Sequence, residues 1–309
     1  MSMRICVFGA GSLGSALGAL LSKGNDVTLV GRRPHMDSIR RSGLRVTGDR
    51  AFKAQVGASE TVRGLEEPDL LIISTKAYDT QEAVRICRAE FRSDDMMALT
   101  LQNGLGNLEL LRSWKGSKAF GGTTTMGAAL SGSGRVHLSG LGRTVIGSDM
   151  DRVGSRRIAS AFSAGGIPVS PCENIQGEIW AKTIVNACIN PVSAILGVPN
   201  GRLLDSRPIF ELLVGICEEG EQVADAVGIE LPIRRLISRV RRVCAETSKN
   251  RSSMLRDIEL GRRTEIREIN GAICRNGRES GVPAPLNLAM CAIVQALEQS
   301  ERGGSVETL

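Results

Sequence analysis

One stretch of this sequence places a lysine and two asparagines at steps of four residues. Residues 177–189 read GEIWAKTIVNACI, and their apolar side chains cover nearly the whole circumference of a helix, which predicts a buried helix. Lys182, Asn186 and Asn190 form one polar stripe on it, because each step advances only about 40° around the axis. Burial lowers the pKa of a lysine, as a proton donor near neutral pH requires. The alternative is a structural lysine that reaches solvent or pairs with a carboxylate. Pro191 should kink or end the helix beside the stripe.

A glutamate interrupts a second apolar pattern. We expect residues 252–258 and 261–271 to be helical, with an acid on an otherwise apolar face. The positions on that face are Ile258, Glu265, Ile269 and Ile273. Two interpretations of Glu265 stay open. It meets a substrate or Lys182, or it forms a buried ion pair or reaches solvent at a helix end.

Histidine and cysteine chemistry has little support. The two histidines, His35 and His137, are too few for a histidine-based metal site and argue against a Ser-His-Asp triad. The eight cysteines include no C-x-x-C pair and lie mostly in apolar runs, which indicates reduced core residues. We therefore expect no bound metal, and proton transfer by Lys, Glu, Asp or Tyr.

A glycine-rich turn follows the first predicted strand. The strand covers residues 4–8, Gly9-Ala-Gly11-Ser-Leu-Gly14 comes next, and a helix over 13–22 and a strand over 26–30 complete a βαβ unit. The glycines permit a tight turn, close approach of a pyrophosphate, and close packing of helix on strand. A merely tight turn is the alternative. In this context we predict a dinucleotide site.

The end of the second strand indicates which dinucleotide binds. NAD-binding chains usually place Asp or Glu there, whereas this chain reads Val30-Gly31-Arg32-Arg33. Guanidinium groups suit a 2′-phosphate, so we predict NADPH. Two ordinary surface arginines are the alternative.

Two further candidates follow later strands. Lys76 comes just after the predicted strand 70–74, and Asn103 comes just after 97–101. Ligands collect at the carboxyl ends of strands in open α/β sheets, which favours both as cofactor contacts. Asn103-Gly104 is also a turn signal in any protein, and a lysine at a strand end is often only solvated.

The order of elements predicts an α/β protein with two domains. Strands and helices alternate as far as residue 170 in a mostly parallel sheet with an antiparallel finish, and further strands are expected at 136–138, 144–146 and 167–169. The pattern is helical nearly throughout 176–299. We predict a Rossmann domain over 1–170 and an all-helical domain over 171–309, the latter carrying the substrate site.

The net charge and the composition limit the kinds of partner that the protein can have. The net charge of +6 fits an anionic small molecule, and the arginine cluster at 234–242 is typical of a solvated helix face, so we expect no nucleic-acid partner. We find no apolar run as long as a membrane span and no room for a signal peptide before the first strand, which favours a cytoplasmic protein without a membrane partner. A homodimer stays open.

The combination of these motifs resembles the ketopantoate reductase family (2-dehydropantoate 2-reductases) from Arg4 to about Gln299. The glycine turn, the Arg32 region, Thr75-Lys76 and Gln102-Asn103-Gly104 match it. The most specific segments are Glu178-x-Trp180-x-Lys182-x-x-x-Asn186-x-x-x-Asn190-Pro191, Pro199-Asn200-Gly201, Ser252-Ser253-Met254-x-x-Asp257 and Thr264-Glu265-Ile266-x-x-Ile269-Asn270-Gly271.

The resemblance implies an oxidoreductase acting on CH–OH groups, which reduces 2-dehydropantoate to pantoate with NADPH in pantothenate biosynthesis. Lys182 would be the general acid, and Glu265 would contact the reacting hydroxyl. The residues implied to hold the 2-oxo acid are Asn186, Asn190 and Ser253. Those implied to hold NADPH are Gly9, Gly11, Gly14, Arg32, Lys76 and Asn103. Two alternatives remain: a related dehydrogenase for another branched 2-oxo acid, and a catalytically silent NADPH sensor.

Overall fold

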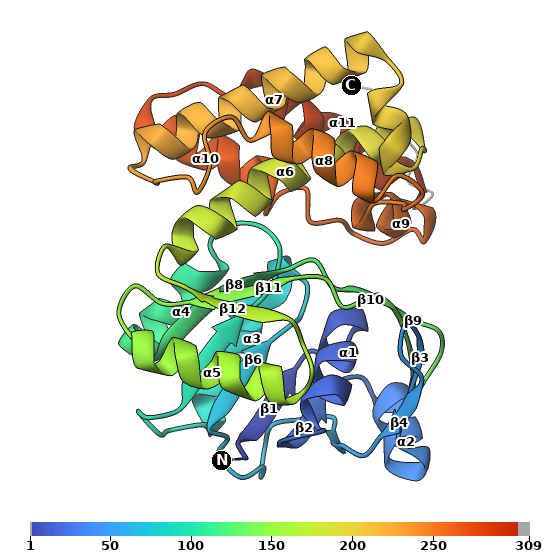
Figure 1. The fold of residues 1–309 in the computed structure, drawn as a ribbon, viewed down its shortest axis with the longest axis vertical. Helices are drawn as coiled ribbons and strands as arrows, with labels where there is room; N and C mark the ends of the chain where they lie inside the picture. The colour runs from blue at the N-terminus through green and yellow to red at the C-terminus, as the bar shows by residue number, and fades with distance from the viewer. Residues whose placement is uncertain (1, 302–309) are drawn as a thin grey trace. The chain divides into compact units, whose positions relative to one another are not determined.

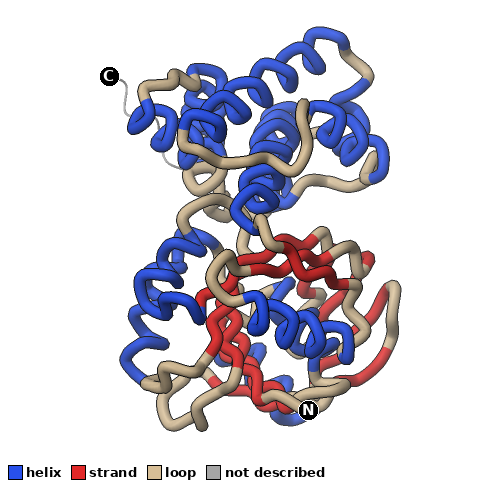
Figure 2. The backbone as a smooth tube through the Cα atoms, turned by 60° about the vertical axis from the view of Figure 1, so that its left-hand side comes forward, coloured by secondary structure: helices blue, strands red, loops and turns tan. Residues whose placement is uncertain are grey.

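The computed structural model describes residues 2–301 (Figure 1). Contacts divide the chain into one unit of Met1–Gln102 with Asn107–Ile175, and a second of Asn103–Gly106 with Gln176–Leu309. Figure 2 shows the strands gathered in the first unit and helices making up nearly all of the second. The expected boundary after residue 170 falls inside a strand, and the four-residue segment Asn103–Gly106 joins the helical unit although it lies far upstream of it.

The first unit is built on an eight-stranded sheet in the order β12-β11-β8-β7-β6-β1-β2-β5. Its strands are β1 (Arg4–Phe8), β2 (Asp26–Val30), β5 (Gly57–Ser59), β6 (Leu70–Ile73), β7 (Met97–Thr100), β8 (Ala119–Thr124), β11 (Thr144–Gly147) and β12 (Val169–Cys172). All neighbours pair in parallel except β8 and β11, so the predicted antiparallel finish is present at β11 only. The last strand, β12, is parallel to β11 and lies at Val169–Cys172, slightly later than the expected 167–169. The central strands β6 and β7 are buried on both faces, as uninterrupted apolar runs require.

Helices cover this sheet. They are α1 (Ser12–Leu21), α2 (Arg33–Ser42), α3 (Thr80–Glu90), α4 (Asn107–Lys115) and α5 (Arg152–Ala164), with 3₁₀ turns η1 (Ala77–Asp79) and η2 (Gly116–Lys118). Helix α1 packs closely on β2, because a Cβ on Gly18 would come within 2.4 Å of the Leu29 side chain. The βαβ unit predicted from the glycine motif is therefore present.

A second sheet of four short strands was not predicted. Its order is β4-β3-β10-β9, from β3 (Leu44–Gly48), β4 (Phe52–Ala54), β9 (Gly127–Leu130) and β10 (Arg135–Gly140). The expected strand at 136–138 belongs here and not in the main sheet, since it pairs with β3 and β9. Its Val136 and Leu138 side chains face the core, and His137 between them faces solvent. Leu44 and Val46 of β3 point to the same core, against α1. The second sheet thus shields one side of α1.

The second unit is helical, as predicted. Its helices are α6 (Ile175–Leu196), α7 (Arg207–Ala226), α8 (Ile237–Glu246), α9 (Ser253–Glu259), α10 (Asn270–Ser280) and α11 (Pro285–Glu301), with the 3₁₀ turn η3 (Asn200–Leu204). Helix α6 packs against α7, where Gly220 lies so close to Ile184 that a Cβ would approach to 2.9 Å, and where the Cys188 thiol faces the Leu213 carbonyl.

Helix α6 runs through Pro191, whereas the sequence also allowed the helix to end there. Proline has no N–H, so the carbonyl of Ala187, four residues earlier, loses its helical donor. The side chain of Asn270 replaces it, with Nδ2 at 3.0 Å from that oxygen, and the same Nδ2 also donates to Asn287 Oδ1 at 3.0 Å. A buried amide from α10 thereby keeps α6 continuous past its proline.

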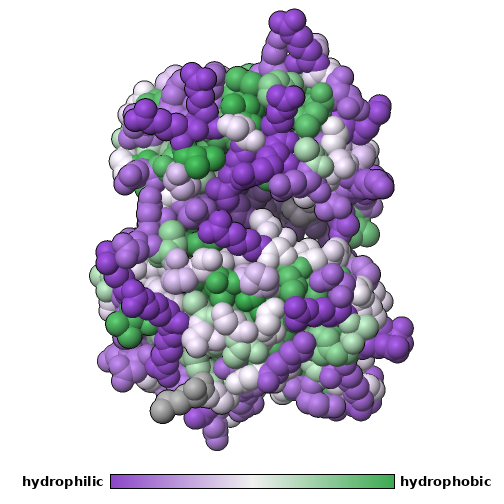
Figure 3. Space-filling model, in the orientation of Figure 1, coloured by the Kyte–Doolittle hydropathy of each residue, from purple (hydrophilic) through white to green (hydrophobic). Residues whose placement is uncertain are grey.

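The 22 residues of α6 are long and apolar enough to pass a length test for a membrane span, but 72% of the tested window is buried inside the structure. That burial is typical of a core helix. On the face seen in Figure 3, hydrophilic side chains cover most of the helical unit, as expected when its apolar faces turn inward.

A hydrogen-bonded chain joins α2, the β9–β10 turn and the glycine turn. The Gly134 N–H donates to His35 Nδ1 at 2.9 Å, so the ring proton lies on Nε2, which contacts Ser15 Oγ at 3.0 Å. Ser15 in turn donates to the Ala10 carbonyl at 3.2 Å. Burial lowers the pKa of His35 below its ordinary value of 6.5, which keeps the ring neutral and preserves this series of hydrogen bonds.

We expect His35→Phe to reduce the free energy of unfolding by about 1–3 kcal/mol, because buried polar groups of Gly134 and Ser15 lose their partner. Below about pH 6.5 the histidine at position 35 is protonated in the unfolded chain but still neutral in the folded protein, so the wild-type free energy of unfolding should decrease as the pH falls below that value. In the His35→Phe variant, the contribution of this histidine to the pH dependence should be absent. Urea titrations between pH 5 and pH 8 measure both effects.

The control is His137→Phe, which changes the other histidine, an exposed residue on β10. It should shift stability by less than about 0.5 kcal/mol. Equal losses for the two variants would contradict a structural role of the His35 chain.

Candidate functional site

The three glycines of the turn differ in what requires them. A Cβ on Gly9, which has φ +103°, would lie 2.6 Å from Thr75 N, and one on Gly14 would lie 2.3 Å from Gly9 O. Those two positions are fixed by packing between the turn and the end of β6. A Cβ on Gly11 would meet nothing closer than Gly9 O at 4.0 Å. Gly11 therefore leaves an open approach at the start of α1, and no side chain caps that helix, so the turn fits a pyrophosphate.

Arg32 and Arg33 have different surroundings. Arg33 Nε lies 3.6 Å from Asp37 and 4.0 Å from Glu60, so its charge is balanced within α2 and the strand end beside it. Arg32 is exposed at the N-terminus of α2 and forms no ion pair within residues 2–301. Of the two, Arg32 is the cation available to an anionic ligand at the end of β2.

The carboxyl ends of β6 and β7 are tied together. The Gln102 amide donates to the Thr75 carbonyl at 2.8 Å and to Thr80 Oγ1 at 2.8 Å. Lys76 follows Thr75 directly and is half-buried at the start of η1. The geometry places Lys76 at the sheet edge where a nucleotide is expected, next to a rigid strand end.

Asn103 lies on a segment that folds with the helical unit. Gly104 has φ +86° and sits so close to the Glu268 carbonyl that a Cβ would be 2.3 Å from its oxygen, while the Leu105 N–H donates to the same oxygen at 3.0 Å. Asn103 Nδ2 then reaches Glu265 Oε2 at 3.2 Å. The Asn-Gly pair is thus a turn, and one that brings Asn103 to the predicted acid.

Glu265 is buried, with 6% of its surface exposed, but it does not lie on a helix. The prediction of a helix over 261–271 was wrong, because α9 ends at Glu259 and Gly261 adopts φ +60°, which turns the chain away from the helical path. Glu265 belongs to the connection before α10, where its carbonyl accepts the Ile269 N–H at 3.0 Å. The apolar spacing that suggested one helical face reflects burial of this connection.

Lys182 is half-buried on α6. Its pKa falls from 10.5 to about 8, because desolvation lowers it more than the Glu265 carboxylate raises it, and the positive charge of Arg239 adds to the lowering. Lys182 therefore lies close enough to Glu265 to feel its charge, and Glu265 also contacts Asn103. A lysine with a pKa near 8 gives and takes a proton near neutral pH.

Sequence reasoning missed Arg239. It was placed in a solvated arginine cluster, whereas its side chain is only 23% exposed and its Nη1 lies 3.3 Å from Glu178 Oε2. Glu178 is one helical turn before Lys182 on α6. The Glu178-Arg239 pair holds a second cation near the lysine, and no local pattern in the sequence marks it, because the two residues are 61 apart.

The remaining predicted residues offer polar groups without protein partners. In the part of the chain that the structure describes, the side chains of Asn186 and Asn190 make no hydrogen bond, although Asn190 is only 7% exposed. Ser252 caps α9 through its contact with the Leu255 N–H at 3.1 Å, which leaves the exposed Ser253 hydroxyl without a hydrogen bond to any described residue. No hydrogen bond links Ser253 to the α6 stripe.

Comparison with known proteins covers nearly the whole chain. The family described as "Ketopantoate reductase PanE/ApbA" matches residues 5–150, and its C-terminal part, "Ketopantoate reductase PanE/ApbA C terminal", matches residues 174–298. The 2-dehydropantoate 2-reductase of Pyrococcus horikoshii is 38% identical, over 98% of this chain and 100% of its own. That of Archaeoglobus fulgidus is 36% identical over 96% and 98%.

Two solved structures have the same fold. A PanE/ApbA family ketopantoate reductase from Ralstonia eutropha is 31% identical with a TM-score of 0.89, over 97% of this chain and 100% of its own. A D-mandelate dehydrogenase bound to NADH and anilino(oxo)acetate is 28% identical with a TM-score of 0.90, over 97% and 99%. The two family matches and the full-length relatives show that this chain belongs to the ketopantoate reductase family.

Proposed function

We propose that the protein reduces 2-dehydropantoate to pantoate with NADPH. The observation that carries the proposal is the half-buried lysine of α6, whose pKa of about 8 is set by desolvation, Glu265 and Arg239. A proton donor of this kind, in a chain that belongs to a family of 2-oxo acid reductases, fits reduction of a carbonyl group.

The first unit supplies the residues for the cofactor. Gly9, Gly11 and Gly14 would hold the pyrophosphate at the start of α1, and Arg32 would pair with the 2′-phosphate. Lys76 and Asn103, at the ends of β6 and β7, would contact the nicotinamide half. Bound NADPH supplies a hydride to the keto carbon.

The second unit supplies the proton. Lys182 would donate a proton to the carbonyl oxygen as negative charge develops there, and would recover one from solvent afterwards. Glu265 would accept a hydrogen bond from the new hydroxyl, and its contact with Asn103 Nδ2 would keep the carboxylate in place. The substrate, the hydride and the proton together give the 2-hydroxy acid.

Asn186, Asn190 and Ser253 would anchor the substrate. The two amides continue the stripe of Lys182 along α6, and their donors have no protein partners within residues 2–301. The Ser253 hydroxyl stands at the first position of α9, adjacent to the serine that caps that helix. Neutral donors of this kind suit a carboxylate and a hydroxyl without fixing a second charge in the site.

A second candidate is reduction of another 2-oxo acid. The observation in its favour is the D-mandelate dehydrogenase structure, which resembles this chain as closely as the ketopantoate reductase structure does by TM-score. Both candidates share the lysine chemistry and differ in the group that the substrate pocket accepts.

The eight cysteines are free thiols, six of them buried, which supports the proposal that the protein works in the reducing cytoplasm. The ion pair with Glu178 neutralises Arg239, one of the arginines in the cluster at 234–242, and so makes this cluster less suited to a nucleic acid. We therefore propose that the partner is a small-molecule substrate.

Arg32→Ala should weaken NADPH binding by about 10- to 100-fold and leave NADH binding nearly unchanged, because one charge-assisted bond to the 2′-phosphate is lost. Fluorescence titration with both cofactors measures this. Arg33→Ala is the matched control and should have a smaller effect, since Arg33 is already paired with Asp37 and Glu60. Equal affinities of the wild type for NADPH and NADH would contradict the assignment of NADPH as the preferred cofactor.

Lys182→Ala should lower kcat about 10²- to 10⁴-fold while NADPH still binds, because the proton donor is lost. The protein should stay folded, since the desolvation of the Lys182 ammonium is relieved and Asn103 still donates to the Glu265 carboxylate. Turnover is measured with 2-dehydropantoate and, for the second candidate, with an aryl 2-oxo acid.

The control is Lys249→Ala, an exposed lysine in the same unit without an ion pair in the described residues, which should keep wild-type turnover. If Lys182→Ala turned over normally and melted at a lower temperature, Lys182 would be structural and the proposed chemistry would fail.

A further inference from the structure

Three cations stand in register across the second sheet. Arg135 of β10 is paired with Arg45 of β3, and Arg45 is paired with Lys53 of β4. Directly opposite residues on neighbouring strands share a face, and like charges in such positions destabilise a sheet. A row of three cations therefore has a cost in stability that packing alone does not explain.

None of these cations is neutralised. Arg45, Lys53 and Arg135 are exposed, and none forms a salt bridge with any residue of the described chain. Asp37 and Glu60, the acids beside α2, pair with Arg33 and Arg40 instead. The row thus faces solvent without an ion-pair partner among residues 2–301.

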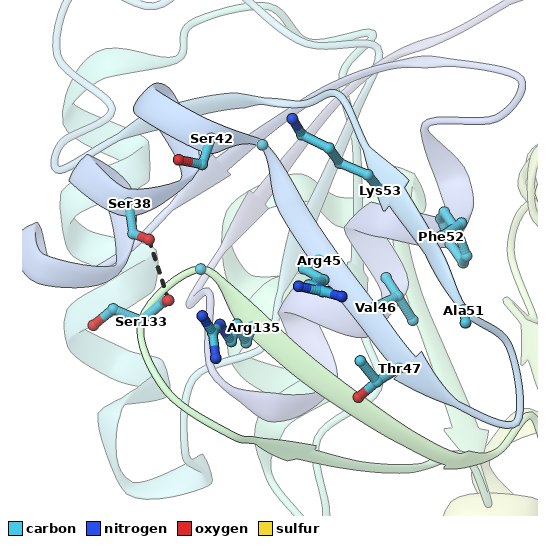
Figure 4. A pocket seen from close by; sticks show the side chains of 12 residues that line it. Ser38, Ser42, Arg45, Val46, Thr47, Ala51, Phe52, Lys53, Ser133 and Arg135 are labelled. Carbon is cyan, nitrogen blue, oxygen red and sulfur yellow. Dashed lines mark hydrogen bonds between the residues drawn. The ribbon is translucent and has the colours of Figure 1, made fainter.

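The row lines a cavity. Its volume is about 610 Å³, within the usual range of small-molecule sites. The lining residues are Ser38, Ser42, Gly43, Arg45, Val46, Thr47, Ala51, Phe52, Lys53, Ser133, Gly134 and Arg135. No acid is among them. Figure 4 shows the two arginines on adjacent strands, the lysine on the next strand, and the serines of α2 and of the β9–β10 turn at the margin.

The walls of the cavity are held in place. Ser38 Oγ donates to the Ser133 carbonyl at 3.1 Å, which joins α2 to the β9–β10 turn (Figure 4). The Gly134 N–H is fixed by His35. A concave surface with rigid margins, three cations and several hydroxyl donors suits a compact anion with several charges better than an extended chain.

This cavity is distinct from the proposed cofactor turn. The opposite face of the second sheet carries Leu44, Val136 and Leu138 and packs against α1, whose first residues border the glycine turn. Neither the glycines nor Arg32 line the cavity. The apolar face of the second sheet therefore separates the cation row from α1.

We propose that the outer face of the second sheet is a separate binding site for a small molecule that carries two or more adjacent phosphate groups. Arg45 and Arg135 contact neighbouring phosphates from two strands, and Lys53 and the hydroxyls of Ser42 and Ser133 complete the ring of donors. Occupation neutralises the repulsion within the row, so the bound anion stabilises the sheet.

The probe is inorganic tripolyphosphate, titrated by calorimetry into the full chain saturated with NADPH, so that the cofactor site is filled. Wild type should bind one equivalent. Arg45→Thr and Arg135→Gln should each weaken tripolyphosphate at least about tenfold, the loss of one charge-assisted bond. Arg156→Gln, which removes an exposed arginine of α5 outside the cavity and without a salt bridge in the described chain, should bind as wild type does.

Two further readouts separate the site from general effects. Without tripolyphosphate, the Tm of Arg45→Thr should equal or exceed that of wild type, because the central repulsion is gone and threonine suits a strand. The NADPH affinity of the variant should be unchanged.

The proposal is overturned if wild type does not bind tripolyphosphate, if neither cavity variant weakens it, or if Arg156→Gln weakens it equally. It is also overturned if Arg45→Thr weakens NADPH as much as tripolyphosphate, since the cavity would then belong to the cofactor site.

Discussion

The proposed chemistry of this protein depends on the desolvation of one half-buried lysine, Lys182. Lys182 sits on the most apolar helix of the second unit, and burial, with Arg239 in the same direction, brings its pKa to about 8 while Glu265 opposes them. A buried cation is costly, so its position must be enforced by the elements around it. Each neighbour is itself held: Glu265 by Asn103, and Arg239 by Glu178. In the proposed mechanism, the balance of these charges, more than any single residue, lets the lysine donate a proton near neutral pH.

Continuity of α6 follows from the same requirement. The stripe of Lys182, Asn186 and Asn190 remains on one line only if the helix stays regular up to Asn190, the residue directly before Pro191. Asn270 makes that possible by donating to the carbonyl that the proline leaves without a partner. A residue of the Asn270-Gly271 segment, which looked like part of a family motif, thus has a clear structural role at the start of α10. In the first unit, the hydrogen bonds from Gly134 through His35 and Ser15 to the Ala10 carbonyl likewise hold the glycine turn in place.

The sequence predicts those features whose causes are local. The glycine turn follows from three residues and their flanking strand and helix, and the polar stripe of α6 follows from helical periodicity. Glu265 was identified as an acid in a buried pattern but was placed on a helix, because apolar spacing does not reveal that Gly261 takes a positive φ. The contact of Asn103 with Glu265 spans 162 residues, and that of Arg239 with Glu178 spans 61, so neither has a local signal. The second sheet was missed because its strands are short and carry charges on their outer face.

The pH dependence of kcat/KM for 2-dehydropantoate reduction tests the role of Lys182 most directly. A general acid works when protonated, so the rate should be constant at lower pH and fall above about pH 8, where Lys182 loses its proton. Because the Glu265 carboxylate raises the pKa of Lys182, Glu265→Gln should move this inflection to lower pH, whatever it does to the maximal rate. A rate that does not fall through this range, or an inflection that Glu265→Gln leaves in place, would contradict the assignment of Lys182 as the proton donor.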